Sequence, residues 1–215
     1  MGTVVALANS KDGVGKTTLA VHLAGWSQEN VGRTAFVDTD VRGHGSSWLR
    51  QASPKAEVFR LLTPEEILDQ VPELAVQFDV LVIDGPSGLP EVTRAILLVA
   101  HLVLVPCGGS TSDARAVHEA IHGIRQARKI RSGPPRALLI PNKLRGRHRP
   151  PPELSDTLKS LSIPVIGGVH LNHAFADAAE QRTLVWRLGP SAGRAVNEIT
   201  DVLGALGLHG SQTGP

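Results

Sequence analysis

The sequence predicts an α/β protein: a single domain built on a doubly wound, mainly parallel sheet with helices on both faces. Short apolar segments rich in β-branched residues alternate along the chain with segments whose apolar residues recur at helical spacing. The length of 215 residues and the hydrophobic content of 41% are those of one folded domain with a substantial core. Ligands of such sheets bind outside the carboxyl ends of the strands, so the loops after strands are where function is expected.

Seven segments are predicted strands because they are short, apolar and β-branched, which is typical of strands buried on both faces. In chain order they are residues 3–8, 33–37, 58–62, 80–83, 102–105, 137–140 and 164–169. Helical patterns lie between and after them. In chain order these are residues 16–28, 64–76, 90–99, 113–131, 152–161 and 191–206. This alternation predicts a parallel sheet covered by helices on both sides.

The chain shows no internal repeat and no interdomain linker. The clearest loop is residues 145–152, where glycine and prolines deny the backbone helical hydrogen bonds. We therefore expect one domain over residues 1–208, followed by a disordered tail at residues 209–215.

Composition favours a protein of the reducing cytoplasm. Cys107 is the only cysteine, so neither an internal disulfide nor a CxxC metal site can form. The residues after Met1 start a predicted strand and lack the charged and apolar regions of a signal peptide. No apolar stretch is long enough to cross a bilayer, so we expect neither export nor membrane insertion.

Charge is unevenly placed along the chain. Residues 115–149 hold ten Lys or Arg residues against one acid, Glu119, while the formal net charge of the whole chain is only +2. A basic segment of this kind suits a polyanion such as DNA, because neutralised phosphates release counterions. A solvated basic surface without a partner is an equal alternative on charge alone.

The loop after the first predicted strand has the composition of a phosphate-binding loop. The strand is followed by Asn9-Ser10-Lys11-Asp12-Gly13-Val14-Gly15-Lys16-Thr17-Thr18 and then by a helical pattern. Glycines let backbone N–H groups converge on phosphate oxygens, and the helix N-terminus adds positive charge. Lys16 is expected to reach the β and γ phosphates and Thr17 to ligate Mg²⁺. The residues expected to contact nucleotide here are Asp12, Gly13, Val14, Gly15, Lys16, Thr17 and Thr18.

Lys11-Asp12-Gly13-Val14-Gly15-Lys16-Thr17-Thr18 resembles the deviant Walker A sequence KGGxGKTT of the ParA/MinD-type P-loop ATPases, with Asp12 in place of its first glycine. In that family the extra lysine crosses a dimer interface and contacts the partner's nucleotide. The resemblance implies this catalytic role for Lys11, together with an ATP-dependent homodimer. An arginine finger supplied in trans follows the same physical logic, since a cation neutralises charge that develops during hydrolysis.

Two acidic segments match the family as well. Asp38-Thr39-Asp40-Val41-Arg42-Gly43 looks like its switch segment, which implies that Asp40 orients the attacking water and that Asp38 lies near Mg²⁺. Val80-Leu81-Val82-Ile83-Asp84 is similar to its Walker B strand, which implies that Asp84 holds the water shell of Mg²⁺. Any one of these acids alone would more often be a turn or helix-cap residue.

The resemblance extends over residues 3–206. Asn142, with Lys143 beside it, matches the strand-end Asn that recognises adenine, because an amide offers both a donor and an acceptor; the alternative is a simple turn residue. The landmarks Asp177 to Gln181 and Leu184 to Trp186 also match.

Two positions depart from the family pattern. Asp12 replaces the first glycine after the signature lysine, and Arg42 stands where ParA proteins often carry Gln. Asp12 tolerates left-handed backbone angles, so the loop can form, but its charge is close to phosphates and to a partner subunit. Either dimerisation is weakened, or a nearby Lys or Arg satisfies Asp12.

One short pattern is best explained by chance. Residues His118, Glu119 and His122 spell HExxH on a predicted helix, as in zinc proteases, but no third ligand is evident in the sequence.

The overall expectation is a small ParA-type ATPase that needs ATP and Mg²⁺ and hydrolyses ATP weakly until a partner stimulates it. The family resemblance implies a homodimer on ATP binding, non-specific binding to nucleoid DNA, a ParB-like cargo adaptor and a cytoplasmic, nucleoid-associated location. The sequence does not identify the cargo. Candidate DNA contacts are Lys143, Arg145, Arg147, Arg149, Arg182, Arg187 and Arg194.

Three other functions are weighed against this one. A nucleotide-binding adaptor with weakened dimerisation and little turnover would follow if Asp12 prevents pairing. A MinD-like membrane positioner should end in a basic amphipathic helix, whereas Leu206 to Ser211 is rich in glycine and nearly uncharged. An amidoligase or biotin-pathway synthetase shares the fold, but Lys11 argues against it.

Overall fold

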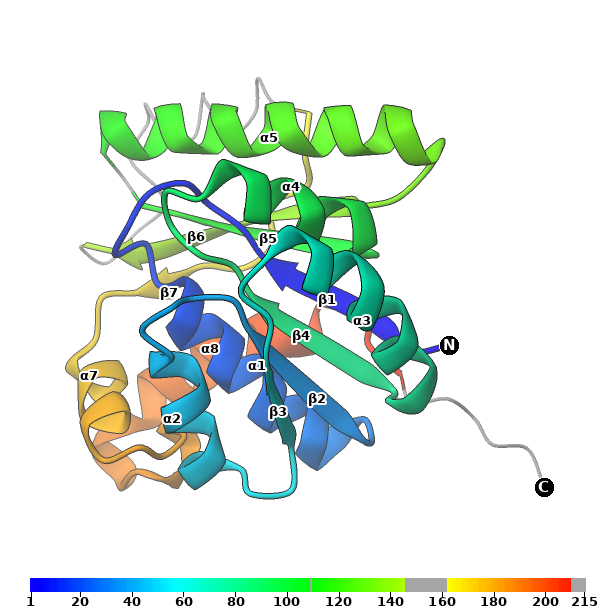
Figure 1. Ribbon diagram of the computed structural model, residues 1–215. Helices are drawn as coiled ribbons and strands as arrows, with labels where there is room; N and C mark the ends of the chain where they lie inside the picture. The colour runs from blue at the N-terminus through cyan, green and yellow to red at the C-terminus, as the bar shows by residue number, and fades with distance from the viewer. Residues whose placement is uncertain (109, 146–161, 210–215) are drawn as a thin grey trace.

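The computed structural model describes residues 1–108, 110–145 and 162–209. Within these ranges one sheet contains β1 (Thr3–Leu7), β2 (Thr34–Asp38), β3 (Glu57–Arg60), β4 (Val80–Asp84), β5 (Leu102–Cys107), β6 (Arg136–Leu144) and β7 (Val169–His170). Their order is β3-β2-β4-β1-β5-β6-β7, and every pairing is parallel (Figure 1). The chain winds outward from β1 in both directions, so the predicted doubly wound fold is confirmed.

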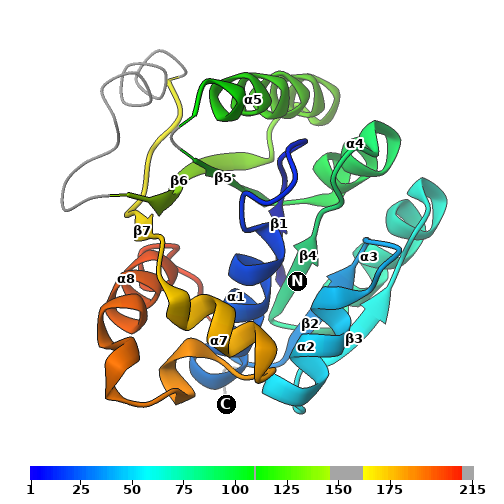
Figure 2. The same ribbon diagram turned by 90° about the vertical axis from the view of Figure 1, so that its left-hand side faces the viewer.

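Helices cover both faces of this sheet (Figure 2). One face carries α3 (Pro64–Gln77), α4 (Pro90–Val99) and α5 (Thr111–Arg131). The other carries α1 (Lys16–Asn30), α2 (His44–Ala52), α7 (His173–Glu180) and α8 (Gly193–Gly204), with the 3₁₀ turns η1 (Val185–Arg187) and η2 (Pro190–Ala192). None of the described helices is both long and apolar enough to cross a membrane.

The alternation of side chains along β1 divides the core into two layers. Val4 and Ala6 pack with the helices on the α5 side, while Val5 and Leu7 pack with those on the α1 side. Neighbouring residues of a strand point to opposite faces, so an apolar run fills both layers at once. The central strand is thereby fixed from both sides, and the loop that follows it starts from a rigid base.

Most predicted elements are present, with bounds shifted by a few residues. The strand predicted at 164–169 is reduced to a single bridge at Val165 and to β7, because the chain turns through Gly167, whose φ is +47°. Two short helices, α2 and α7, were not predicted. The helix predicted at 152–161 lies outside the described residues, as does the tail predicted at 209–215 except for His209.

Parallel register brings the predicted site residues to one edge of the sheet. Asp84 at the end of β4 is level with Leu7 of β1 and with Asp38 of β2. The phosphate-binding loop leaves β1 at that same level, and Asn142 lies near the end of β6. All the strand ends that the sequence selected therefore meet at the carboxyl edge, as expected for this fold.

Candidate nucleotide-binding site

Two glycines shape the loop between β1 and α1. Gly13 and Gly15 have φ angles of +71° and +95°, backbone conformations that residues with a Cβ rarely adopt. A Cβ on Gly15 would also lie 2.3 Å from Nδ2 of Asn142. The loop then enters α1, whose first turn carries no acidic residue, so the positive end of the helix faces the loop without a competing carboxylate.

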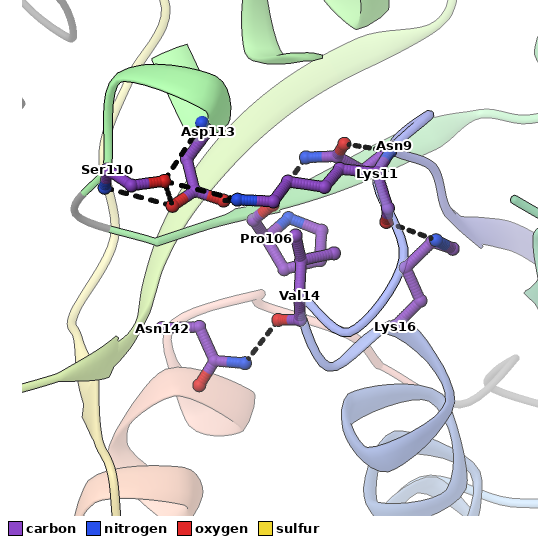
Figure 3. Close-up of polar contacts among 8 residues, drawn as sticks. All are labelled: Asn9, Lys11, Val14, Lys16, Pro106, Ser110, Asp113 and Asn142. Atoms are coloured by element: carbon purple, nitrogen blue, oxygen red, sulfur yellow. Dashed lines mark hydrogen bonds and ion pairs between the residues drawn. The ribbon is translucent and has the colours of Figure 1, made fainter. Parts of the chain in front are cut away.

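Two asparagines hold this loop in place (Figure 3). Nδ2 of Asn9 donates to the carbonyl of Pro106 on β5 at 2.8 Å, and its Oδ1 accepts from the N–H of Lys11 at 2.9 Å. On the other side, Nδ2 of Asn142 donates to the carbonyl of Val14 at 2.8 Å. Both asparagines are buried, so each fixes the loop to a neighbouring strand. The role of Asn9 was not predicted from the sequence, although its position directly after the first predicted strand could have indicated it.

Asn142 thus has a structural contact in addition to its predicted one. Its amide donor is used by the loop carbonyl, while the predicted adenine contact would need the remaining oxygen or a rearrangement. The adenine contact of Asn142 and Lys143 stays a prediction. Lys143 itself has a φ of +55° and lines the same cavity as Gly13 and Lys16.

Lys16 is a buried cation at the centre of the loop. Its Nζ donates to the carbonyl of Lys11 at 3.0 Å and to Oγ of Ser87 at 2.5 Å. Burial lowers the pKa of Lys16, and nearby carboxylates, chiefly Asp84, oppose that shift. A partly desolvated ammonium group that is held by neutral oxygens interacts strongly with a phosphate anion, because little water screens the attraction.

Asp84 has the properties of a cation ligand. It is 1% exposed, and its Oδ1 has no hydrogen-bond partner among the described residues. Burial raises its pKa to about 7, although a hydrogen bond from Thr17 lowers it. Mg²⁺ takes oxygen ligands and compensates a buried carboxylate, so Asp84 and the Thr17 hydroxyl fit this ion.

Asp38 and Asp40 organise the segment between β2 and α2. Oδ1 of Asp38 accepts from the N–H of Asp40 at 3.0 Å, and Oδ2 accepts from the N–H of Ser46 at 2.7 Å. Asp38 is fully buried, and both its oxygens are bonded to backbone, so it caps the first turn of α2. The predicted proximity of Asp38 to a metal stays a prediction; its carboxylate acts in this structure through the backbone of the switch segment.

The loop, the acids and the start of α2 enclose a cavity of 230 Å³, which we call the phosphate cavity. Nine of its lining residues were predicted from the sequence: Asp12, Gly13, Gly15, Lys16, Thr17, Thr18, Asp40, Asp84 and Lys143. Five further lining residues that were not assigned to the site are Arg42, His44, Gly45, Gly85 and Ser87. Their signal was positional, since all five lie in the segments that follow β2 and β4, and each of these strands ends in a predicted acid.

A second cavity of 560 Å³ lies on the other side of the loop, between it and the ends of β5 and β6. Lys11 enters this region: its Nζ is 2.6 Å from Oδ1 of Asp113 and 3.1 Å from Oγ of Ser110 (Figure 3). Burial raises the pKa of Asp113, but the hydrogen bonds from Lys11 and Ser110 hold it below the usual value. Lys11 therefore bonds to its own chain, on α5, in this structure.

Asp12 does not use the conformation that its sequence suggested. Among the residues that the structure describes, those other than glycine with positive φ are Ser132, Lys143, Ser162 and Arg182. Asp12 is not among them, so its tolerance of left-handed angles is not what permits the loop. The side chain is exposed on the rim that the two cavities share, and it is close enough to oppose the lowering of the Lys16 pKa that burial causes.

The candidate DNA contacts are spread over the surface and several are already bonded. Arg187 pairs with Glu29 and donates to the carbonyl of Ala52, and Arg194 Nε lies 2.8 Å from Glu198. Arg182 donates to Oγ of Ser47 at 2.6 Å. Lys143 is the second-last residue of β6, and Arg145 directly follows that strand. Arg147 and Arg149 lie outside the described residues.

The HExxH residues lie on an exposed face of α5. His118 and His122 are exposed, and Nε2 of His122 lies 2.9 Å from the Gln126 amide. In the described part of the chain, no three His, Cys, Asp or Glu side chains gather as a metal site.

Comparison with known proteins gives one family model and several relatives. The CobQ/CobB/MinD/ParA nucleotide-binding domain model matches residues 5–185. Maintenance of carboxysome distribution protein A from Gloeobacter kilaueensis is 31% identical over 122 residues, which are 55% of each chain. The septum site-determining protein MinD from Bacillus subtilis is 26% identical over 207 residues, 78% of this chain and 75% of that one. The matches cover about half the length of the first three curated relatives.

Solved structures show the same fold. An ATP complex of a Cyanothece McdA variant aligns with a TM-score of 0.76 at 14% identity, covering 94% of this chain and 96% of that chain. MinD from Pyrococcus horikoshii, complexed with Mg-ADP, aligns with a TM-score of 0.73 at 16% identity, covering 96% of both chains.

Proposed function

The chain belongs to the CobQ/CobB/MinD/ParA family of nucleotide-binding domains, and on that basis we propose that it is a Mg²⁺-dependent ATPase that partitions or positions a large cargo. The observation that carries the proposal is the joint position of Lys16, Thr17 and Asp84 around one cavity at the carboxyl edge of the sheet. A desolvated ammonium, a helix N-terminus and a buried carboxylate suit a triphosphate with its metal ion. In this site Lys16 would hold the β and γ phosphates, and Asp84 and Thr17 would hold Mg²⁺.

The cycle we propose couples nucleotide state to assembly. Mg-ATP binding drives homodimer formation, and Lys11 leaves Asp113 to contact the partner's nucleotide. The ATP-bound dimer binds nucleoid DNA without sequence preference, and a ParB-like adaptor stimulates slow hydrolysis and releases it. The support is the family and the basic segment of residues 115–149. Phosphate contacts dominate such binding, which makes it sensitive to salt.

One experiment tests this cycle. DNA retention is measured with ATP, with ADP and without nucleotide, at rising salt, for the wild type and for Asp40→Ala. Retention that requires ATP, falls steeply with salt and is prolonged by Asp40→Ala is the expected result. Retention that ignores nucleotide would refute the proposed coupling.

Two observations favour a second function, that of a nucleotide-binding adaptor with little turnover. Lys11 is bonded within its own chain, and the negative charge of Asp12 lies on the rim where a partner's phosphates would approach. A chain that cannot pair would bind nucleotide and signal through it with little turnover. The discriminating measurement is mass in solution with ATP: an unchanged monomer at every accessible concentration would favour this adaptor.

A further inference from the structure

Ser87 is a hydroxyl residue of the phosphate cavity to which the proposed cycle gives no role. It follows the end of β4 by three residues and lines the cavity together with Lys16, Thr17 and Asp84. Its Oγ accepts a hydrogen bond of 2.5 Å from Nζ of Lys16, the buried cation of the loop. This contact places the Ser87 hydroxyl beside the ammonium group that is expected to hold the β and γ phosphates.

Lys16 is held from two segments of the chain at once. Besides its contact with Ser87, its Nζ donates to the carbonyl of Lys11 at 3.0 Å, within the loop after β1 (Figure 3). An ammonium group has three N–H donors, so these two contacts with described residues leave one donor for a phosphate oxygen. Both acceptors are neutral oxygens, which orient the cation without cancelling its charge.

The backbone on either side of Ser87 is fixed. The N–H of Gly85 donates to the carbonyl of Leu7 on β1 at 3.1 Å, and a Cβ at position 85 would lie 2.3 Å from that carbonyl oxygen. On the other side, the N–H of Thr93 donates to the carbonyl of Leu89 at 3.0 Å in the first turn of α4. Ser87 therefore lies in a short connection that is held at both ends, which limits how far its hydroxyl can move from Lys16.

The position of Ser87 after β4 favours a contact with the γ phosphate over one with the β phosphate. In P-loop ATPases the backbone N–H groups of the loop hold the α and β phosphates, and the metal ion bridges β and γ oxygens. Asp84, the residue expected to hold that ion, ends the strand that Ser87 follows. Lys16, which is expected to reach the γ phosphate, is bonded to Ser87 itself. The hydroxyl thus lies near two groups that are expected to meet at the γ phosphate.

We propose that the Ser87 hydroxyl donates a hydrogen bond to the γ phosphate, so that each chain distinguishes ATP from ADP before it pairs. This inference rests on the proposed ATPase function. A hydroxyl accepts and donates at the same time, so Oγ can stay bonded to Lys16 while its hydrogen bonds to a phosphate oxygen. Among the described residues none accepts that hydrogen. ADP lacks the γ phosphate, so the contact forms with ATP alone, and Lys11 keeps its expected role in the paired state.

A purely structural role of Ser87 predicts a different outcome. If its hydroxyl only orients Lys16, its loss disturbs a cation that contacts the β phosphate as well as the γ phosphate. Binding of ADP and of ATP would then weaken by the same factor. A direct contact with the γ phosphate weakens the binding of ATP and leaves the binding of ADP as it was.

The test compares binding of ADP with binding of a non-hydrolysable ATP analogue, both with Mg²⁺, by calorimetry at concentrations where light scattering shows a monomer. Ser87→Ala should unfold like the wild type, because the side chain is only partly buried, and should keep the ADP affinity within about twofold. Its affinity for the analogue should fall about 10-fold or more, the usual loss for a hydrogen bond to a charged group. Ser87→Thr keeps the hydroxyl and should restore most of this loss. Ser191→Ala, at an exposed position of η2, is the matched control.

Phosphorus NMR of the bound analogue provides the second measurement. The γ-phosphorus signal of the Ser87→Ala complex should shift from its wild-type position, while the β-phosphorus signal should stay. Equal weakening of ADP and analogue binding, or analogue binding as tight as that of the wild type, would overturn the inference alone. Failure of the folded wild type to bind either nucleotide would overturn both the inference and the proposed function.

Discussion

Replacing Asp84 with Asn measures what burial of this carboxylate costs the protein when no cation is bound. Burial raises the pKa of Asp84 from 3.8 to about 7, which corresponds to about 4 kcal/mol against the charged form in the folded state. A carboxyl group with a raised folded-state pKa contributes its full stability below pH 3.8 and loses it as pH rises toward 7. Asn is nearly isosteric and does not titrate, so Asp84→Asn should lack this loss.

The assay is urea unfolding in the presence of a chelator, at about pH 4 and about pH 8. Between these two pH values, the wild type should lose up to about 4 kcal/mol of unfolding free energy relative to Asp84→Asn. Excess Mg²⁺ at the higher pH should return part of that loss to the wild type and leave the variant unchanged. Asp201→Asn, an exposed position on α8, controls for the change of charge.

If the unfolding free energies of the wild type and Asp84→Asn change in parallel with pH, burial does not raise the pKa of the Asp84 carboxyl group in the folded protein. An equal response of both proteins to Mg²⁺ would refute the assignment of Asp84 as the metal-holding residue.

Three further predictions concern residues around the loop. His22 is fully buried, and burial lowers its pKa to about 4. Its stabilising effect should therefore be full above pH 6.5, and about 3 kcal/mol of unfolding free energy should be lost as the pH falls toward 4. Urea unfolding of His22→Gln should not show this loss in acid. Gly15→Ala should be less stable than Gly13→Ala by about 1 to 3 kcal/mol and should melt at a lower temperature, because only at position 15 does the new Cβ meet Asn142. Equal melting temperatures of the two variants would contradict this. Asp12→Gly should tighten ATP-dependent pairing of two chains about fivefold, since it removes roughly 1 kcal/mol of repulsion between the Asp12 carboxylate and the partner's phosphates. Unchanged pairing in light scattering would show that Asp12 does not weaken the dimer.

The sheet and the edge that carries the site were predictable because burial on both faces leaves a strong local signal. Segments such as Val80 to Asp84 are continuous apolar runs that end in one acid, and parallel pairing then places that acid beside its neighbours. Local pattern and global topology agree there, so the prediction of the site followed from the fold.

The helix α2 was not predictable from periodicity. It begins with His44-Gly45-Ser46-Ser47, residues that usually favour turns, and it is held by a tertiary contact from Asp38 to the N–H of Ser46. A bond between residues on two different elements has no local pattern in sequence. The places of Arg42 and Ser87 in the phosphate cavity were missed for the same reason.

The orientation of the Lys11 side chain could not be predicted from the sequence either. A family resemblance implies where a lysine acts in an assembly, but not where it rests in a single chain. Its partners Ser110 and Asp113 follow β5, about a hundred residues away, and only the register of β1 and β5 brings them together.

Calorimetric titration of ATP into the pure folded chain, with and without Mg²⁺, is the decisive test of the proposed nucleotide site. Saturable binding at one site per chain is expected. Mg²⁺ should strengthen this binding, and Lys16→Gln should abolish it while keeping the wild-type unfolding profile. Absence of heat with the wild type, or undiminished binding by Lys16→Gln, would contradict the proposed site.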